Sequence, residues 1–289
     1  MGQSGPVHAD GWRQRIDGAV DFVRRRVAGD YEVDESGYDP QLMTAVLMPL
    51  FRPLYRTWFR VRMRGVENVP ASGAALVVAN HSGVLPLDAI MLQIGLFDEH
   101  PEHRNLRLLS ADLVYEVPVL SSMARRSGHI RAGREEAERQ LAAGELVGVF
   151  PEGFKGVGKP FGQRYQLQRF GRGGFAKLAR QAGAPIVPCA IVGAEEIYPM
   201  IGNWSRLARL LGLPYFPVTP LFPWLGLVGA VPLPSNWIIE FCPPVPTDGF
   251  VAWPGADQRQ SVSCLADKVR DTIQRKLDEV VAERGPAFS

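Results

Sequence analysis

The 289-residue chain has few cysteines, few lysines and no recognisable export signal. Its three cysteines are isolated from one another and form no Cys-x-x-Cys pair, which excludes a disulfide framework or a cysteine zinc site and favours a reducing compartment. The first ten residues have neither the basic start nor the apolar run of a secretory signal, so we expect a cytoplasmic protein. The five histidines lack metal-ligand spacing, and we expect no metal.

An excess of charge of either sign is also missing. The 32 basic residues nearly balance the 30 acidic ones, and a net charge of +2 gives no reason to expect nucleic-acid binding. With 46% hydrophobic and 21% charged residues, the chain has the composition of a folded globular protein with a large core. The basic residues are 27 arginines and only 5 lysines, a skew that fits either genome composition or bidentate phosphate contacts.

Two stretches depart from this average. Residues 210–239 contain no charged residue, but six prolines interrupt them, so a continuous membrane-spanning helix is not expected. Residues 40–66 contain five arginines and no acid among many apolar residues. They fit either a segment at a membrane interface or a helix packed on the domain with Trp58 in the core. The same two alternatives apply to the aromatic residues in and just before the uncharged stretch, which are Trp204, Tyr215, Phe216, Phe222 and Trp224.

Expected strands and helices alternate along most of the chain. Residues 59–64 alternate between apolar side chains and arginine, and residues 74–79 form a short apolar run, so both are predicted strands. Further strands are expected at 106–109, 146–150, 185–192 and 237–241, and helices at 11–28, 41–57 (bent near Pro49 and Pro53), 86–96, 134–143, 174–182 and 261–283. The alternation predicts an α/β fold with a mostly parallel, mixed sheet flanked by helices, preceded by N-terminal helices. We divide the chain into a helix and linker at 1–40, an amphipathic segment at 41–64 and one domain at 65–285.

The first polar junction follows the strand at 74–79 and runs from Asn80 to Asp88. Its glycine and proline favour a tight loop that enters a helix, which can fold the Asp88 carboxylate back onto the His81 imidazole. A carboxylate that holds one ring nitrogen raises the basicity of the other, as a general base needs. The alternative is an ordinary strand-end histidine and a first-turn acid favoured by the helix dipole.

The second junction runs from Phe150 to Pro160. Gly153-x-x-x-x-Gly158-Lys159 imitates a P-loop, but Pro160 stands where a magnesium-binding Ser or Thr is required, which excludes a nucleoside-triphosphatase. Seven basic residues and no acid lie between Lys155 and Arg180, as in a phosphate site or a solvated face. A third junction at 127–134 adds two arginines before an expected helix N-terminus, a favourable place for phosphate.

Together these junctions resemble the lysophospholipid and glycerolipid acyltransferase superfamily. The resemblance rests on four blocks between residues 64 and 192, namely Asn80-His81-Ser82 followed by an acid, Gly128-x-Ile130-Arg131, Phe150-Pro151-Glu152-Gly153 and Ile186-Val187-Pro188. Six residues separate His81 from Asp88, more than in the common pattern. This variant and residues 192–199 are similar to the monoacylglycerol and diacylglycerol acyltransferase-like branch.

The resemblance implies a glycerolipid acyltransferase-like fold and an O-acyltransferase that uses acyl-CoA or an acyl-carrier protein as co-substrate and needs no cofactor. His81 would take the proton of the acceptor hydroxyl, and Asp88 would orient and support the imidazolium. The implied substrate-binding residues are Asn80, Ser82, Gly128, Arg131, Glu152, Gly153 and Lys155. Among these, Glu152 and Gly153 would shape the acceptor pocket, while Arg131 and Lys155 would bind phosphate.

The acceptor and the cellular setting stay open at this point. The branch favours mono- or diacylglycerol, whereas the basic segment after Lys155 would suit lysophosphatidic acid. Because the substrates are lipids, we expect a peripheral protein on the cytoplasmic face of a membrane. A serine esterase is excluded by the lack of a Gly-x-Ser-x-Gly turn, while a non-catalytic lipid-binding protein remains an alternative.

Overall fold

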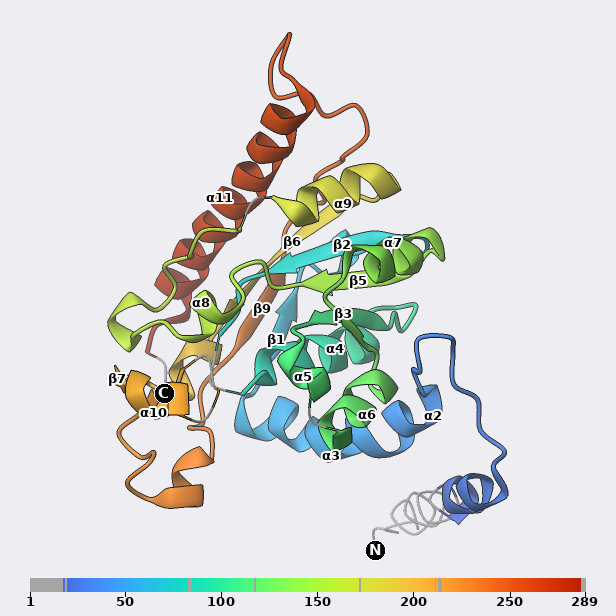
Figure 1. The fold of residues 1–289 in the computed structure, drawn as a ribbon, viewed down its shortest axis with the longest axis vertical. Helices are drawn as coiled ribbons and strands as arrows, with labels where there is room; N and C mark the ends of the chain where they lie inside the picture. The colour runs from blue at the N-terminus through green and yellow to red at the C-terminus, as the bar shows by residue number, and fades with distance from the viewer. Residues whose placement is uncertain are drawn as a thin grey trace, which may run out of the picture.

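A seven-stranded sheet in the order β1-β9-β6-β2-β5-β3-β4 forms the centre of the molecule (Figure 1). The computed structural model describes residues 18, 20–82, 85–116, 118–171, 173–210, 212 and 215–286. The strands are β1 (Arg62–Arg64), β2 (Ala75–Ala79), β3 (Leu106–Ser110), β4 (His129–Arg131), β5 (Leu146–Val149), β6 (Ile186–Val192) and β9 (Ile238–Phe241), with β7 (Gly202–Asn203) and β8 (Pro217–Val218) in a separate pair. Only β6 and β9 pair antiparallel in the main sheet, which confirms the mostly parallel, mixed sheet.

Helices cover both faces of this sheet. They are α4 (Leu87–Glu99), α5 (Leu113–Glu116), α6 (Pro118–Arg126), α7 (Arg134–Ala142), α8 (Phe154–Val157), α9 (Gly174–Ala182), α10 (Ser205–Leu210) and α11 (Gln258–Arg284). Short 3₁₀ turns are η3 (Val66–Asn68), η4 (Phe161–Gln163), η5 (Ala194–Glu196) and η6 (Gly226–Ala230). Of the expected first helix, residues 20–28 are helical, and residues 11–17 lie outside the described residues.

The alternation along β2 separates two cores. Ala75, Val77 and Ala79 share one face of β2 and pack with α4 and the helical segment 40–58. Leu76 and Val78, on the opposite face, pack with α7, α9 and α11. All five residues of β2 are buried, as expected of a central parallel strand with helices on both sides. Three layers result, and the carboxyl ends of the parallel strands meet at one edge.

Residues 40–58 are helical throughout, but the helix is not a regular α-helix. It consists of α2 (Pro40–Leu42), the π-helical η1 (Met43–Leu47), α3 (Met48–Pro53) and the π-helical η2 (Leu54–Trp58). Prolines cannot donate a backbone hydrogen bond, and the wider π turns lie beside Pro49 and Pro53. The helix predicted at 41–57 is therefore present, and π segments lie next to the two prolines where a bend was expected.

The strand predicted at 59–64 is shorter than expected, since β1 starts at Arg62. Arg60 has a left-handed backbone (φ 44°), which interrupts the extended conformation. Phe59 is buried and stacks on Trp237, with ring centroids 4.6 Å apart. Its apolar character therefore reflects a core position at the end of the helical segment, and the period-two pattern was misleading there.

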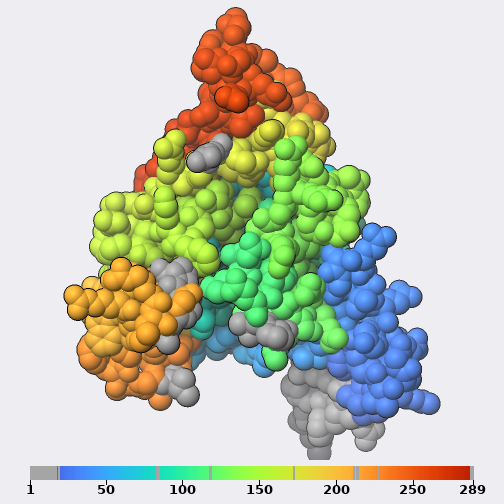
Figure 2. All heavy atoms as spheres, in the orientation of Figure 1, coloured from blue at the N-terminus to red at the C-terminus, as the bar shows by residue number. Residues whose placement is uncertain are grey.

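The uncharged stretch forms part of a lobe, residues 201–233, beside the sheet domain (Figure 2). Trp204 and Trp224 pack edge to face with centroids 6.1 Å apart, and both are largely exposed, at 48% and 63%. Trp58 is 38% exposed and donates to the Pro232 carbonyl oxygen at 2.9 Å, so these three tryptophans lie at the surface and not in the core. Within the part of the chain that the structure describes, no helix has the length and apolar character needed to cross a membrane.

Candidate active site

His81 and Asp88 meet at the carboxyl end of β2. The Nδ1 atom of His81 lies 2.7 Å from Oδ2 of Asp88, whose side chain is fully buried in the first turn of α4. The Asp88 carboxylate also accepts the backbone N–H of Ser82 at 2.9 Å and that of Ala89 at 2.8 Å. The loop therefore folds Asp88 back onto the imidazole, which is the arrangement predicted from the sequence.

The surroundings of His81 leave its second ring nitrogen as the basic atom. Because the Asp88 carboxylate only accepts, Nδ1 carries the proton of the neutral ring and Nε2 has the free lone pair. Burial by itself lowers the pKa of His81, but the charge of Asp88 and the hydrogen bond to it outweigh burial and raise that pKa above its ordinary value. The ring stacks on Phe150 at 4.5 Å, and 18% of the side chain stays exposed.

Glu152 is hydrogen-bonded to the backbone of the His81 loop. Its side chain is completely buried, with Oε1 accepting the backbone N–H of His81 at 3.2 Å and Oε2 that of Gln168 at 2.7 Å. The two oxygens of this buried carboxylate are thus used in hydrogen bonds with the protein backbone. In this structure the Glu152 carboxylate holds the His81 and Gln168 backbones, and its place in the acceptor pocket stays a prediction.

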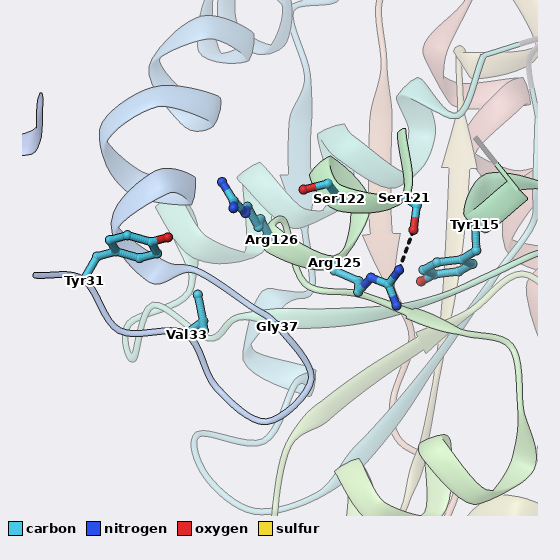
Figure 3. A pocket seen from close by; sticks show the side chains of 8 residues that line it. All are labelled: Tyr31, Val33, Gly37, Tyr115, Ser121, Ser122, Arg125 and Arg126. Carbon is cyan, nitrogen blue, oxygen red and sulfur yellow. Dashed lines mark hydrogen bonds between the residues drawn. The ribbon is translucent and has the colours of Figure 1, made fainter. Parts of the chain in front are cut away.

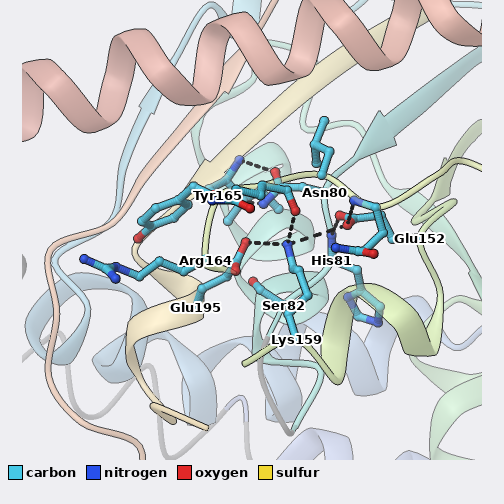
Figure 4. A network of polar contacts seen from close by, with 12 residues as sticks. Asn80, His81, Ser82, Glu152, Lys159, Arg164, Tyr165 and Glu195 are labelled. Atoms are coloured by element: carbon cyan, nitrogen blue, oxygen red, sulfur yellow. Dashed lines mark hydrogen bonds and ion pairs between the residues drawn. The ribbon is translucent and has the colours of Figure 1, made fainter. Parts of the chain in front are cut away.

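A buried lysine neutralises this carboxylate and a second one. Nζ of Lys159 lies 3.6 Å from Glu152 and 3.0 Å from Glu195, and all three side chains are at most 6% exposed (Figure 4). Burial raises the pKa of Glu195 to about 7, although Lys159 acts in the opposite direction. The sequence analysis assigned no role to Glu195 and considered Lys159 only in the rejected P-loop pattern and within a basic run, because the proximity of the two residues depends on the fold.

Asn80 and Ser82, the other two residues of the first block, also face the protein. The Asn80 amide donates to the Ile191 carbonyl oxygen at 2.9 Å and accepts the Ile191 N–H at 2.7 Å, which continues the pairing of β2 with β6 beyond the end of β2. Ser82 is 1% exposed, and its Oγ has no hydrogen-bond partner among the described residues. Both hydrogen bonds of the Asn80 side chain to described residues are therefore with β6, and its substrate-binding role stays a prediction.

Comparison with known proteins identifies the family. The Acyltransferase family model matches residues 60–192. An uncharacterised protein of Mycobacterium tuberculosis is 53% identical over 275 residues, which cover 95% of this chain and 76% of that protein. The chain belongs to this acyltransferase family. The chain is accordingly an acyltransferase by family.

Two further relatives bear on the fold and the branch. A bovine protein described as a DGAT1/2-independent enzyme synthesizing storage lipids is 25% identical over 77% of this chain and 60% of its own length, in agreement with the predicted branch. The crystal structure of the 1-acyl-sn-glycerophosphate acyltransferase PlsC from Thermotoga maritima superposes with a TM-score of 0.55 at 19% identity, covering 83% of this chain and 80% of that one. This likeness confirms the acyltransferase fold.

Two glycines, one in the third acyltransferase block and one just after it, allow this loop to approach His81. Gly153 has φ 53° and ψ −143°, a conformation that side chains disfavour. A Cβ on Gly156 would lie 2.9 Å from the His81 carbonyl oxygen and 2.7 Å from Cβ of Glu152. Gly153 thus serves the backbone turn, and Gly156, which the sequence analysis did not single out, is required by this close approach.

The remaining predicted residues of the acyltransferase are not in contact with His81. Gly128 makes a left-handed turn (φ 86°) before β4 and is buried. Arg131 ends β4, two strands beyond β5, and its exposed guanidinium lies 3.2 Å from Asp112. Lys155 is exposed on α8, with no ion pair to any described residue. Both cations are accessible, and among the described residues neither forms a hydrogen bond or an ion pair with His81.

Among the described residues no cluster of potential ligands suits a metal ion. His129, the variable residue of the second block, is a histidine with a hydroxyl partner. Its Nδ1 contacts the Ser110 hydroxyl at 2.7 Å, and burial lowers its pKa to about 4. It is a neutral side chain held by a hydroxyl, and it has no carboxylate partner of the kind that His81 has.

Proposed function

We propose that this acyltransferase moves a fatty acyl group from acyl-CoA, or from an acyl-carrier protein, to the hydroxyl of a neutral glycerolipid such as mono- or diacylglycerol. The observation that carries this proposal is the His81 to Asp88 contact of 2.7 Å, with the imidazole still partly exposed at the carboxyl edge of the sheet. Such a pair holds a base in one tautomer and leaves one nitrogen available to a substrate.

In this mechanism Nε2 of His81 takes the proton of the acceptor hydroxyl as its oxygen attacks the thioester carbonyl carbon. The carbon–sulfur bond then breaks, and the imidazolium returns the proton to the leaving thiolate. Asp88 stabilises the imidazolium between these two events. General-base catalysis of this kind contributes about 10²–10⁴-fold, and positioning of the two substrates supplies much of the remainder.

The distribution of charge supports a neutral acceptor. Lys159, which belongs to the basic run after Lys155, is compensated by Glu152 and Glu195 and is not available to a phosphate. Near His81 the buried network therefore contains two carboxylates for one ammonium group. The similarity to the bovine enzyme described as synthesizing storage lipids points the same way.

A lysophosphatidic acid acceptor is the alternative, and one observation favours it. Arg131 keeps its guanidinium 63% exposed beside the carboxyl edge of the sheet, where it is accessible to an acceptor phosphate. The structural neighbour from Thermotoga maritima is named for that activity. In this case acylation of lysophosphatidic acid would depend on Arg131, whereas acylation of a neutral acceptor would not.

The test is an acyl-transfer assay with acyl-CoA or acyl-carrier protein as donor and monoacylglycerol, diacylglycerol and lysophosphatidic acid as acceptors. We expect His81→Ala to reduce kcat by about 10²–10⁴-fold while leaving lipid binding unchanged. His103→Ala is the matched control, since His103 is exposed and the one hydrogen bond of its side chain to a described residue is with the Phe97 carbonyl oxygen. Full activity of His81→Ala would remove the mechanism, and no transfer to any acceptor with lipid binding intact would favour a non-catalytic lipid-binding protein.

We further propose that the protein associates with the cytoplasmic face of a membrane without spanning it. Helices α3 and α6 and the 201–233 lobe lie at one end of the molecule, away from the start of α11 (Figures 1 and 2). Exposed apolar side chains gather on these elements, namely Leu50, Val119, Leu120, Met123, Ile201, Trp204, Trp224, Leu225 and Val228. Tryptophans at such a surface suit the interface of a bilayer.

A flotation assay with lipid vesicles tests this association. Trp204→Ser combined with Trp224→Ser is expected to release most of the protein from the vesicles. Trp253→Ser, an equally exposed tryptophan outside this end, is expected to leave flotation unchanged. Equal flotation of both variants would contradict the assignment of the surface.

A further inference from the structure

A cavity of about 500 Å³ lies between the linker that precedes α2 and helix α6 (Figure 3). None of the residues around His81 lines it. The lining residues are Tyr31, Val33 and Gly37 of the linker, Tyr115 of α5, and Ser121, Ser122, Arg125 and Arg126 of α6. Its volume is in the range of pockets that hold small molecules and cofactors.

The linker wall of the cavity is fixed by contacts with the sheet domain. Asp34 pairs with the buried Arg107 of β3 at 2.6 Å, and the Tyr38 hydroxyl donates to Asn105 at 2.8 Å. Gly37 makes the turn between them with φ 89°, and a Cβ on it would lie 3.4 Å from Cβ of Arg125. The wall is therefore a docked part of the fold that lies directly against α6.

The cavity presents positive charge that no carboxylate neutralises among the residues that the structure describes. Arg125 donates to the Ser121 hydroxyl at 2.7 Å, and neither Arg125 nor Arg126 forms an ion pair there. The linker does carry acids, but Glu32 and Asp34 alternate with the lining residues and do not line the cavity. Two guanidinium groups among serine hydroxyls and tyrosine rings suit a ligand with phosphates and an aromatic ring.

Tyr115 connects this cavity with the edge of the sheet that carries His81. Its ring lies 5.6 Å from the Arg125 guanidinium and 5.4 Å from that of Arg131, the last residue of β4. Its hydroxyl is buried and has no hydrogen-bond partner among the described residues. Because β5 and β3 separate β4 from β2, Arg131 and His81 are about three strand spacings apart, or roughly 14 Å.

The separation from Arg131 to His81, which does not include the further step past Tyr115 to Arg125, matches the length of the arm of one candidate donor. The arm that joins the nucleotide of coenzyme A to its thioester contains two amides, and at ~3.5 Å for every three bonds of an extended chain it spans roughly 15 Å. We propose that the cavity binds the nucleotide of the acyl-CoA donor, with Arg125 and Arg126 on its phosphates and the base beside the tyrosines. This assignment rests on the proposed function, because it requires coenzyme A as the acyl carrier.

Direct binding tests the cavity independently of acyl transfer. The wild-type protein is titrated calorimetrically with adenosine 3′,5′-bisphosphate, and the double variant Arg125→Gln/Arg126→Gln is expected to bind it about tenfold or more weakly. Arg259→Gln, in the exposed first turn of α11, is the matched control and should bind as the wild type does. Inorganic phosphate and lysophosphatidic acid are titrated in parallel to separate a nucleotide site from a general phosphate or lipid site.

Kinetics give the second measurement. In the double variant we expect KM for acyl-CoA to rise by about tenfold or more with kcat and the acceptor KM unchanged. An acyl-pantetheine donor, which lacks the nucleotide, should be used equally by variant and wild type. Bisphosphate binding that depends on the two arginines supports the site even if no acceptor is acylated, which separates this inference from the proposed function.

Three results would overturn the assignment. They are the absence of bisphosphate binding by the wild type, phosphate or lysophosphatidic acid binding as tight as that of the bisphosphate, and an unchanged KM for acyl-CoA in the double variant. In the last case acyl transfer itself would stand while the nucleotide would have to bind elsewhere.

Discussion

Replacing Lys159 with methionine tests whether the buried ion network holds the active site in place. The variant keeps most of the side-chain volume but leaves Glu152 and Glu195, at 0% and 6% side-chain exposure, without their shared cation. Removing one partner of a buried ion pair costs about 3–5 kcal/mol, and we expect that loss of unfolding free energy at pH 8. Because Glu152 accepts the His81 N–H, acyl transfer should fall as well.

The loss should depend on pH with a definite sign. In the wild type the pKa of Glu195 is raised from 4.5 in the unfolded chain to about 7, so the folded state binds more protons between these values and becomes less stable as the pH rises through 7. Without Lys159 the pKa rises further and this loss extends to higher pH. At pH 6 Glu195 is mostly protonated in both proteins, so the difference should shrink by up to about 1.4 kcal/mol.

Urea unfolding followed by tryptophan fluorescence at pH 6 and pH 8 measures both effects. Lys177→Met, on the exposed face of α9, is the control and should change stability little. Lys159→Met/Glu195→Gln should recover part of the loss at pH 8, since it removes one uncompensated carboxylate. The reasoning fails if Lys159→Met and the wild type have the same unfolding free energy at pH 8. It also fails if the variant loses the same unfolding free energy at pH 6 and at pH 8.

Two other variants address the catalytic loop. Asp88→Asn should reduce kcat by about 10²–10⁴-fold. It should also move the acidic limb of the kcat/KM profile to lower pH, because the Asp88 charge raises the pKa of His81. An acidic limb at the wild-type pH would contradict this. Gly156→Ala should lose about 1–3 kcal/mol in urea unfolding and most of its activity because of the 2.9 Å approach to the His81 carbonyl oxygen, whereas Gly162→Ala, whose Cβ would meet nothing within 4 Å, should behave as the wild type.

The central strands and the His81–Asp88 pair could be predicted because their signals are local. A short apolar run with turn residues on both sides indicates a buried strand, and β2 lies within one residue of the predicted 74–79. The glycine and proline between His81 and Asp88 make a loop that is short enough for the two side chains to meet. β4 was not predicted, because its three residues are too few to show a period.

The contacts of Asn80 and Glu152 could not be predicted in the same way. Each side chain bonds backbone groups that are distant in sequence, Ile191 in one case and His81 with Gln168 in the other. Backbone groups leave no residue-type signal, so a motif shows that a polar side chain is required without showing what it touches. The resemblance assigned both residues to the substrate, which stays a prediction, and the structure adds that they fix the ends of neighbouring strands and loops.

The adjacent glutamates after β6 explain how one side of the site is held. Glu195 pairs with Lys159, while Glu196 accepts from the Tyr165 hydroxyl at 2.6 Å and forms a buried ion pair with Arg284 at the end of α11. One turn therefore fixes the 159–165 loop both to the sheet and to the last helix.

Lys159 of that loop also lies near the Glu152 carboxylate, which accepts the His81 backbone N–H. The same contacts therefore help to fix the position of the His81 backbone. The other side of the carboxyl edge, toward Arg131 and α6, is built from exposed arginines without comparable internal partners. Buried ion pairs are thus concentrated behind His81, and the accessible cations lie on the side where the proposed acyl-CoA donor would approach.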